Sequence, residues 1–197
     1  MLLQQIGAGL MELKNICKSF DGRQVLSDVS LVVPKGSRVL ISGVSGRGKT
    51  TLLRIMMGLE KPDSGEITGA FSKQAAVFQE DRLQAEFTPV TCVKMTSGAH
   101  VTKQEIRARL AEVGLEGHMD KPAGKLSGGM RRRVAIVRAL MSDADIIYFD
   151  EPFTGLDAET KLRVIECINR HTSGKTLVFV SHAEEDAALL NAKEIRI

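Results

Sequence analysis

At residues 43–50 the chain reads Gly43-Val44-Ser45-Gly46-Arg47-Gly48-Lys49-Thr50. This segment matches the phosphate-loop pattern of Gly, four residues, then Gly-Lys-Thr. It follows a short apolar run and precedes a helical pattern, which is the placement that such a loop requires. Its glycines allow successive backbone N–H groups to point at phosphate oxygens, and the following helix adds its N-terminal dipole. A glycine-rich strand-to-helix turn with an exposed lysine explains the same context less well.

Each polar side chain of the segment has an expected role. We expect Lys49 to reach the β- and γ-phosphates of a nucleotide, and the Thr50 hydroxyl to ligate Mg²⁺. The residues of this segment that we expect to bind the nucleotide are Gly43, Ser45, Gly46, Gly48, Lys49, Thr50 and Thr51.

Strand and helix patterns alternate along the chain. Strands are predicted at residues 11–20, 24–33, 38–42, 75–78, 145–149 and 176–181, and helices at residues 48–57, 88–98, 102–113, 127–141 and 158–171. The Asp-Gly pair at residues 21–22 predicts a hairpin between the first two strands. The fold class predicted is α/β, a P-loop NTPase core with a mostly parallel sheet, an N-terminal antiparallel portion and an inserted helical lobe at about residues 81–140. Residues 1–10 are predicted to be an extension outside the fold, and residues 11–197 a single domain.

Composition narrows the function classes. The chain has 197 residues, 43% of them hydrophobic and 26% charged, with a formal net charge of +3. Only 4% are aromatic, which argues against a base-stacking nucleic-acid platform. The three cysteines are far apart and form no Cys-x-x-Cys pair, so no zinc motif or disulfide framework is predicted. No apolar run approaches the length of a membrane span.

A pair of acidic residues ends the apolar run at residues 145–149. Parallel strands present their carboxyl ends to the ligand edge of a sheet, which places Asp150 and Glu151 near the phosphate loop. We expect Asp150 to hold Mg²⁺, and Glu151 to act as the general base that polarises the attacking water. Acids end many strands, so this prediction depends on the phosphate loop.

A third motif, Leu-Ser-Gly-Gly-Met at residues 126–130, follows the other two in the order expected for one family. With the phosphate loop and the acidic pair, it resembles the signature of the ATP-binding-cassette (ABC) family, in which Gln is commonest where Met130 stands. Ser127 is also a natural helix N-cap, and with Gly128 and Gly129 it offers bare N–H groups to an anion. The resemblance implies a head-to-tail dimer of two copies, with two ATP molecules between Ser127–Gly129 of one copy and the phosphate loop of the other.

Four further residues occupy positions of functional residues in that family. Gln79 resembles the glutamine-loop residue, which contacts Mg²⁺ and the attacking water and joins the lobe to the core. Asp157 resembles the D-loop aspartate, which contacts the opposite subunit, although it is also a natural N-cap for the next helix. His182 resembles the switch histidine, which bonds the γ-phosphate. Phe20 stands where an aromatic residue stacks on adenine, or it belongs to the core.

The remaining basic residues suggest no further site. Consecutive helical positions point in different directions, so the three arginines at 131–133 are predicted to be solvated side chains with salt bridges inside the lobe. His100, His118 and His171 show no ligand spacing and are predicted to lie on the surface.

The resemblance implies a transporter subunit with ATP and Mg²⁺ as cofactors. Its expected partners are a second copy, two membrane permease subunits and, in an importer, an extracytoplasmic solute-binding protein, with no nucleic acid. The expected location is peripheral, on the cytoplasmic face of the membrane. The sequence Phe-Gln-Glu-Asp-Arg-Leu at residues 78–83 resembles importers of nitrate, sulfonate and taurine type, although residues 84–88 depart from their pattern. The alternative is a soluble, non-transport ABC ATPase that gates a protein or nucleic-acid partner.

Overall fold

The computed structural model describes residues 10–69, 71–183 and 185–197. The strands are β1 (Leu10–Phe20), β2 (Arg23–Pro34), β3 (Arg38–Ser42), β4 (Ser64–Thr68), β5 (Gln74–Val77), β6 (Ile146–Asp150), β7 (Thr176–Val180) and β8 (Lys193–Arg196). The helices are α1 (Lys49–Met56), α2 (Pro89–Lys94), α3 (Lys103–Glu112), α4 (Gly128–Leu140), α5 (Ala158–His171) and α6 (Glu185–Leu189). Two short 3₁₀ turns, η1 (Glu116–His118) and η2 (Ala123–Lys125), lie between α3 and α4.

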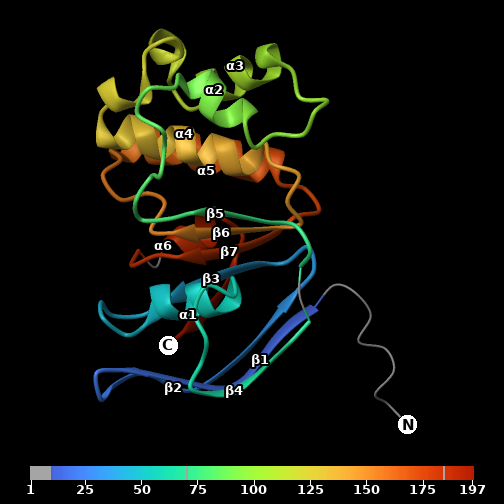
Figure 1. Cartoon of the computed structure of the whole chain (residues 1–197), viewed down its shortest axis with the longest axis vertical. Helices are drawn as coiled ribbons and strands as arrows, with labels where there is room; N and C mark the ends of the chain where they lie inside the picture. The colour runs from blue at the N-terminus through green and yellow to red at the C-terminus, as the bar shows by residue number, and fades with distance from the viewer. Residues whose placement is uncertain (1–9, 70, 184) are drawn as a thin grey trace.

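Two sheets form the core. The strand order is β2-β1-β4 in an antiparallel sheet and β5-β6-β7-β3-β8 in a parallel sheet. Figure 1 shows α1 between the two sheets, α4 and α5 over the opposite face of the parallel sheet, and α2 and α3 beyond α4. The predicted α/β fold with a parallel sheet and an antiparallel N-terminal portion is confirmed.

Strands β6 and β7 are buried along their whole length, which explains their continuous apolar sequences. Successive side chains of each strand point to opposite faces of the sheet. Phe149 stacks on Phe179 with ring centroids 4.6 Å apart, on the face covered by α4 and α5. Tyr148 and Val178 point to the other face and pack in the cluster that α1 shares with the antiparallel sheet.

The hairpin between β1 and β2 is confirmed. Asp21 and Gly22 both have positive φ, 48° and 76°, as the two central residues of a type I′ turn require. Leu10 begins β1 and pairs with Pro34, so the extension predicted at residues 1–10 is wrong for Leu10. Residues 1–9 lie outside the described residues.

Other predicted boundaries differ from the structure. The helix expected at residues 88–98 ends at Lys94 in α2, and the loop expected at residues 121–125 contains η2. The elements β4, β8 and α6 were not predicted. Leu83 and Phe87 of the region between β5 and α2 pack on the same hydrophobic cluster as α4 and α5, so one core runs from α3 through α5 to the parallel sheet. Within the described ranges, no helix has the length and apolarity needed to cross a bilayer.

Candidate functional site

The phosphate-loop segment connects the buried strand β3 to α1. Gly48 is the N-cap of α1 and has φ of 83°, a left-handed conformation that favours glycine. A side chain at Gly48 would also collide with β2, because a Cβ there would lie 2.8 Å from the carbonyl oxygen of Val25. Glycine is therefore needed at this position both for backbone conformation and for the close approach of β2.

Lys49 is 5% exposed and points back into its own loop. Its Nζ donates to the carbonyl oxygens of Gly43 at 2.8 Å and Val44 at 3.1 Å, and lies 3.3 Å from Nδ1 of His182. Burial lowers the pKa of Lys49, and the charges of Glu151 and Asp150 oppose that shift. The ammonium group stands at the wall of a cleft of about 430 Å³. The lining residues of this cleft are Val25, Ser45, Gly46, Gly48, Lys49, Thr50, Thr51, Gln79, Glu151, Thr154 and His182.

Thr50 and Asp150 form the metal-ligand candidates. The Thr50 hydroxyl donates to Oδ1 of Asp150 at 3.0 Å, across the gap between α1 and the end of β6. Asp150 is 3% exposed; burial raises its pKa and the Thr50 hydrogen bond opposes the shift. Thr50, Asp150 and Gln79 line one small cleft of about 140 Å³. Hydroxyl, carboxylate and amide oxygens are the ligands that suit Mg²⁺, so these three residues fit the predicted metal.

Glu151 and His182 face each other at the same edge of the sheet. Nε2 of His182 lies 2.8 Å from Oε1 of Glu151. Glu151 has φ of 50°, an unfavourable conformation for a non-glycine residue, and its N–H donates to the carbonyl oxygen of Val180 on β7. Burial raises the pKa of Glu151, opposed by His182 and Lys49. A carboxylate with a raised pKa beside a cleft is suited to accept a proton from water.

The Leu-Ser-Gly-Gly-Met segment lies away from this cleft. Ser127 caps α4 by accepting a hydrogen bond from the N–H of Met130 at 3.2 Å. None of Ser127, Gly128 and Gly129 belongs to the described residues that line the cleft around Lys49. A Cβ on Gly129 would lie 3.3 Å from the carbonyl oxygen of Gly155, so this position has little space for a side chain. Each chain therefore carries the cleft and the exposed N-terminus of α4 as separate sites.

A phosphate loop occurs in several protein families, and the sequence around this one matches one of them. The profile described as ABC transporter matches residues 26–154. The chain belongs to the ABC transporter family. It is an ATP-binding and ATP-hydrolysing subunit of that family, and the resemblance stated from its three motifs is confirmed.

Relatives of this ABC subunit include proteins from different kinds of transporter. It is 36% identical to the lipoprotein-releasing system ATP-binding protein LolD of Syntrophotalea carbinolica, over 94% of this chain and 93% of the relative. It is 36% identical to an aliphatic sulfonates import ATP-binding protein, SsuB 1 of Pseudomonas savastanoi pv. phaseolicola, over 92% of this chain and 78% of the relative. The bacterial ABC transporter cassette MJ0796, solved as a dimer, superimposes with a TM-score of 0.79 at 27% identity and covers 94% of both chains.

Two predicted residues of the ABC subunit have additional structural roles. Asp157 is the N-cap of α5 and accepts hydrogen bonds from the N–H of Thr160 at 2.9 Å and its hydroxyl at 2.8 Å. The Thr160 N–H bond is the largest cause of the lowered pKa of Asp157. Phe20 is 43% exposed and lies under Nζ of Lys18, 5.0 Å from the ring centroid. The alternative that Phe20 belongs to the core is wrong.

Two predictions about basic residues are wrong in part. Arg132 is only 7% exposed rather than solvated, although the predicted salt bridges inside the lobe are present, from Arg131 and Arg132 to Asp81. His171 is half-buried rather than on the surface, and its Nε2 lies 2.8 Å from Oε2 of Glu112. Arg109 also pairs with Glu112 and contacts His171. Neither burial was visible in the sequence, because both depend on residues more than 50 positions away.

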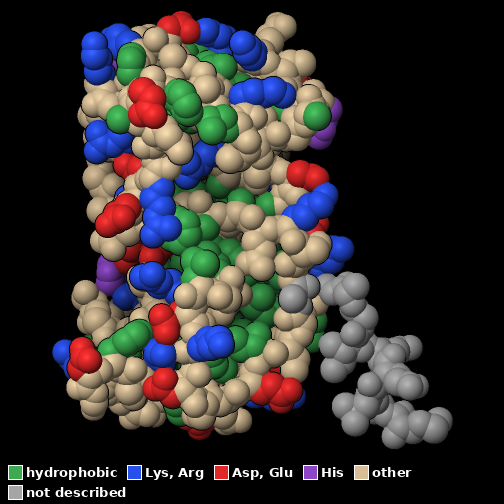
Figure 2. Space-filling view, viewed as in Figure 1, with side chains coloured by type: hydrophobic (Ala, Val, Ile, Leu, Met, Phe, Trp, Pro, Cys, Tyr) green, Lys and Arg blue, Asp and Glu red, His purple; other side chains and the backbone are tan. Residues whose placement is uncertain are grey.

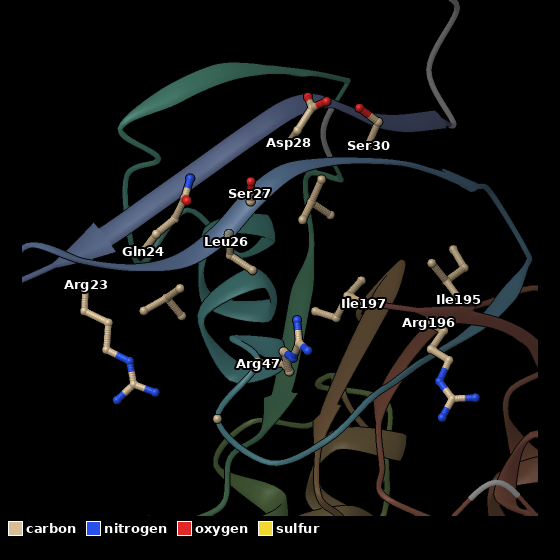
Figure 3. Close-up of a pocket in the computed structure, with 13 residues that line it drawn as sticks. Arg23, Gln24, Leu26, Ser27, Asp28, Ser30, Arg47, Ile195, Arg196 and Ile197 are labelled. Carbon is tan, nitrogen blue, oxygen red and sulfur yellow. The ribbon is translucent and has the colours of Figure 1, made fainter.

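The cleft also contains two residues that sequence reasoning missed, Val25 and Thr154. Val25 is on β2 and reaches the cleft only because that strand crosses over Gly48. A larger hollow of about 640 Å³ adjoins the cleft, shares Val25 and Gly46 with it, and extends along β2 to Arg47 and the end of β8. Figure 3 shows Leu26, Arg47 and Ile197 around it. Lys49, Asp150 and Glu151 are not among the residues that line this hollow.

Proposed function

We propose that this ABC subunit hydrolyses MgATP in sites that two copies of the chain build together. The observation that supports this is the separation within one chain: Lys49, Glu151 and His182 line one cleft, and Ser127 stands outside it. In a head-to-tail dimer, the N-terminus of α4 of one copy would close the cleft of the other. The D-loop residue Asp157, at the start of α5, would contact the opposite copy in the same arrangement.

Each side chain of the cleft then has a role. Lys49 would pair with the β- and γ-phosphates, and the glycine-rich backbone would donate its N–H groups to them. Thr50, Asp150 and Gln79 would hold Mg²⁺, which neutralises charge on the phosphates. Glu151 would take a proton from the attacking water. His182 would orient Glu151 and donate to the γ-phosphate.

At the far side of the nucleotide, two groups would complete the composite site. The α4 N-terminus with Ser127, Gly128 and Gly129 of the second copy would bind the γ-phosphate through N–H groups and a hydroxyl. The exposed ring of Phe20 would stack on adenine.

Mixing two inactive variants tests the shared site. Lys49→Ala removes phosphate binding, and Ser127→Arg blocks the signature, so each parent is defective at both sites. A mixed dimer has one site with both defects and one site with neither. We expect recovery of up to about a quarter of wild-type ATPase activity if mixing is random and the sites are independent. A mixture no more active than its parents would contradict the composite site.

The transported solute would pass through partner subunits. An open apolar groove of about 500 Å³ runs beside the Gln79 loop, and Met57, Leu59, Ala75, Phe78 and Tyr148 are among its lining residues. Figure 2 shows hydrophobic side chains gathered in the middle of this face, between the lobe and the antiparallel sheet. Two membrane permease subunits would each insert a segment into one such groove, which places the cassette peripherally at the cytoplasmic face of the membrane.

Substitution within the groove tests this docking. Leu59 is 55% exposed and does not touch the phosphate cleft, so Leu59→Glu should spare ATP binding. We expect the variant to lose co-purification with its permease subunits. Glu66→Gln, at an exposed position of β4 outside the groove, is the control. Retention of the permease by Leu59→Glu would exclude this groove as the docking site.

Import of a sulfonate-like solute, with an extracytoplasmic solute-binding protein, is the first candidate for the transport reaction. It is supported by the SsuB relatives, whose names specify sulfonate import. Lipoprotein release is the second candidate, supported by the similarity to LolD along nearly the whole of both chains. A permease that co-purifies with a solute-binding protein would favour import, and one that carries a large extracytoplasmic domain of its own would favour release.

A further inference from the structure

The loop after β5 is bound to α4 through its backbone. The guanidinium of Arg132 donates to the carbonyl oxygens of both Phe78 and Gln79. Six residues further along α4, Arg138 donates to the carbonyl oxygens of Arg82 at 3.0 Å and Asp81 at 3.3 Å. Four carbonyl groups between positions 78 and 82 are therefore held by two arginines of one helix.

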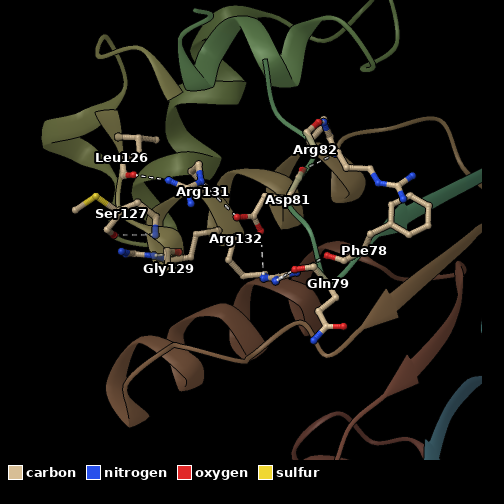
Figure 4. A network of polar contacts seen from close by, with 12 residues as sticks. Phe78, Gln79, Asp81, Arg82, Leu126, Ser127, Gly129, Arg131 and Arg132 are labelled. Carbon is tan, nitrogen blue, oxygen red and sulfur yellow. Dashed lines mark hydrogen bonds and ion pairs between the residues drawn. The ribbon is translucent and has the colours of Figure 1, made fainter. Parts of the chain in front are cut away.

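The carboxylate of Asp81 extends this network to the start of α4. It lies 3.3 Å from Nε of Arg132 and 3.6 Å from Nε of Arg131. Arg131 in turn donates to the carbonyl oxygen of Leu126 at 2.8 Å, next to the helix cap Ser127. Figure 4 shows this continuous series of contacts, with the side chain of Gln79 pointing away from Arg132 while its carbonyl faces the guanidinium.

Burial strengthens these contacts. Arg132 and Asp81 are both largely shielded from water, at 8% and 13% side-chain exposure, so their attraction is weakly screened. Burial raises the pKa of Asp81, and the charges of Arg132 and Arg131 oppose that shift. An arginine is suited to this position because its planar group can bond two carbonyls and a carboxylate at once.

We propose that Arg132 is a positioning residue that makes residues 78–82 and the N-terminus of α4 a single rigid unit. Gln79 then moves with the helical lobe rather than with the sheet, and the joint to the core lies between Val77, the last residue of β5, and Phe78. The inference rests on the proposed composite site. In such a dimer, the unit places Gln79 in the site of its own chain and Ser127 in the site of the partner, so both sites are assembled by one movement.

A merely structural role for Arg132 would change stability without a selective effect on turnover. We expect Arg132→Ala to bind ATP with wild-type affinity, because Arg132 does not line the phosphate cleft. Its kcat should fall by about 10- to 100-fold, which is the effect expected when Gln79 and Ser127 are slightly misplaced at the reacting centre. KM should change less than kcat, as for an interaction realised in the transition state. Arg132→Lys, which keeps a charge and a donor, should recover part of the lost kcat.

Arg107→Ala is the matched control, because Arg107 also pairs with an aspartate, Asp120, in the same lobe but does not contact residues 78–82. A kcat for Arg132→Ala within about twofold of that control would overturn the proposal. If thermal unfolding shows that Arg132→Ala does not fold, Arg132→Lys and Asp81→Asn replace it. Wild-type kcat in both replacements would overturn the proposal equally.

Mixed dimers test whether Arg132 acts on both sites. With Lys49→Ala, the only intact phosphate loop is that of the Arg132→Ala chain, so activity depends on the Gln79 of that chain. With Ser127→Arg, the only intact signature is that of the Arg132→Ala chain, so activity depends on its Ser127. A rigid unit predicts low activity in both mixtures, whereas recovery in either one would show that Arg132 does not position the corresponding residue.

The mixture of Lys49→Ala with Ser127→Arg separates the two proposals. If that mixture recovers activity, the composite site holds, and the Arg132 mixtures then show which residue Arg132 positions. If it does not recover, the composite site fails. The kcat of Arg132→Ala against Arg107→Ala then still decides whether Arg132 positions Gln79.

Discussion

Among single residues, the polar and charged side chains of the cleft are hydrogen-bonded to one another or to the loop backbone. Lys49 bonds two carbonyl oxygens of its own loop, Thr50 bonds Asp150, and His182 bonds Glu151. Lys49 and Asp150 are buried, so their hydrogen bonds are stronger than they would be in water, and either group would be costly to leave unpaired. A phosphate or a metal that enters must replace these contacts, which favours ligands of high charge.

We expect Lys49→Ala to weaken nucleotide binding. The substitution removes a charge-assisted contact to the β- and γ-phosphates. ATP affinity measured by calorimetry should fall by about 10-fold or more, or roughly 1.4 kcal/mol per decade. Lys61→Ala, on the loop before β4, is a control that keeps the same net charge as the variant. Equal affinities for the two variants would show that Lys49 does not contact the phosphates.

We expect Glu151→Gln to separate binding from hydrolysis. The amide keeps the shape of the side chain but cannot accept a proton, so turnover should fall by about 10²–10⁴-fold while ATP still binds. ATP should then persist between two copies, and gel filtration with MgATP should show the dimer. Near-wild-type turnover would exclude Glu151 as the general base.

The pH dependence of turnover follows from the same residue. A general base works only when ionised, so activity is lost as the pH falls through its pKa. Burial raises the pKa of Glu151 above the ordinary 4.5, which moves this loss to higher pH. We expect the midpoint of the acid limb of the kcat profile to lie above pH 4.5. ATP binding is measured at each pH to confirm saturation. An acid limb at or below 4.5 would contradict a buried base.

At the scale of elements, helix α3 shows how local sequence supports the lobe. The Thr102 hydroxyl accepts a hydrogen bond from the N–H of Glu105 at 3.2 Å, and the Glu105 carboxylate accepts one from the N–H of Thr102 at 2.7 Å. This reciprocal capping box joins the two residue types that favour it, a Thr at the N-cap and a Glu three positions later. Ile106 and Leu110 then bury the inner face of α3 in the core shared with α4.

We expect Thr102→Ala to destabilise the protein without affecting catalysis. Loss of the cap should cost about 1 kcal/mol of unfolding free energy. For a chain of this size, that lowers Tm by roughly 2–4 °C. Lys103→Ala, at the neighbouring exposed position, should have an effect within about 0.5 kcal/mol. Equal melting temperatures for the two variants would show that the box contributes nothing.

For the whole molecule, the separation of the phosphate cleft from the signature helix predicts that the ATPase rate depends on protein concentration. The phosphate cleft and the signature helix occupy separate places in one chain, so under the proposed composite site a complete site forms only when two copies meet. ATPase rate should therefore rise more steeply than linearly with protein concentration while the subunit is dilute, because the dimer forms by mass action. Rates strictly proportional to concentration would favour a monomeric ATPase.

Local patterns in the sequence were enough to predict several parts of this protein. The phosphate loop needs glycines and a lysine at set spacing, β6 and β7 need continuous apolar runs, and the capping box needs two residue types three apart. Each pattern carries its own physical cause within about ten residues, so each was predictable without the partners that it meets in the fold.

Other elements and contacts could not be predicted, because they form through residues that are distant in the chain. β4 and β8 have polar, exposed sequences and exist because β1 and β3 offer them free edges to pair with. Arg132 looked like one of three solvated arginines, and its role follows from carbonyl groups more than 50 residues earlier. Hydrogen-bond partners and burial of this kind are properties of the assembled chain, because packing rather than residue type determines which polar groups lose water.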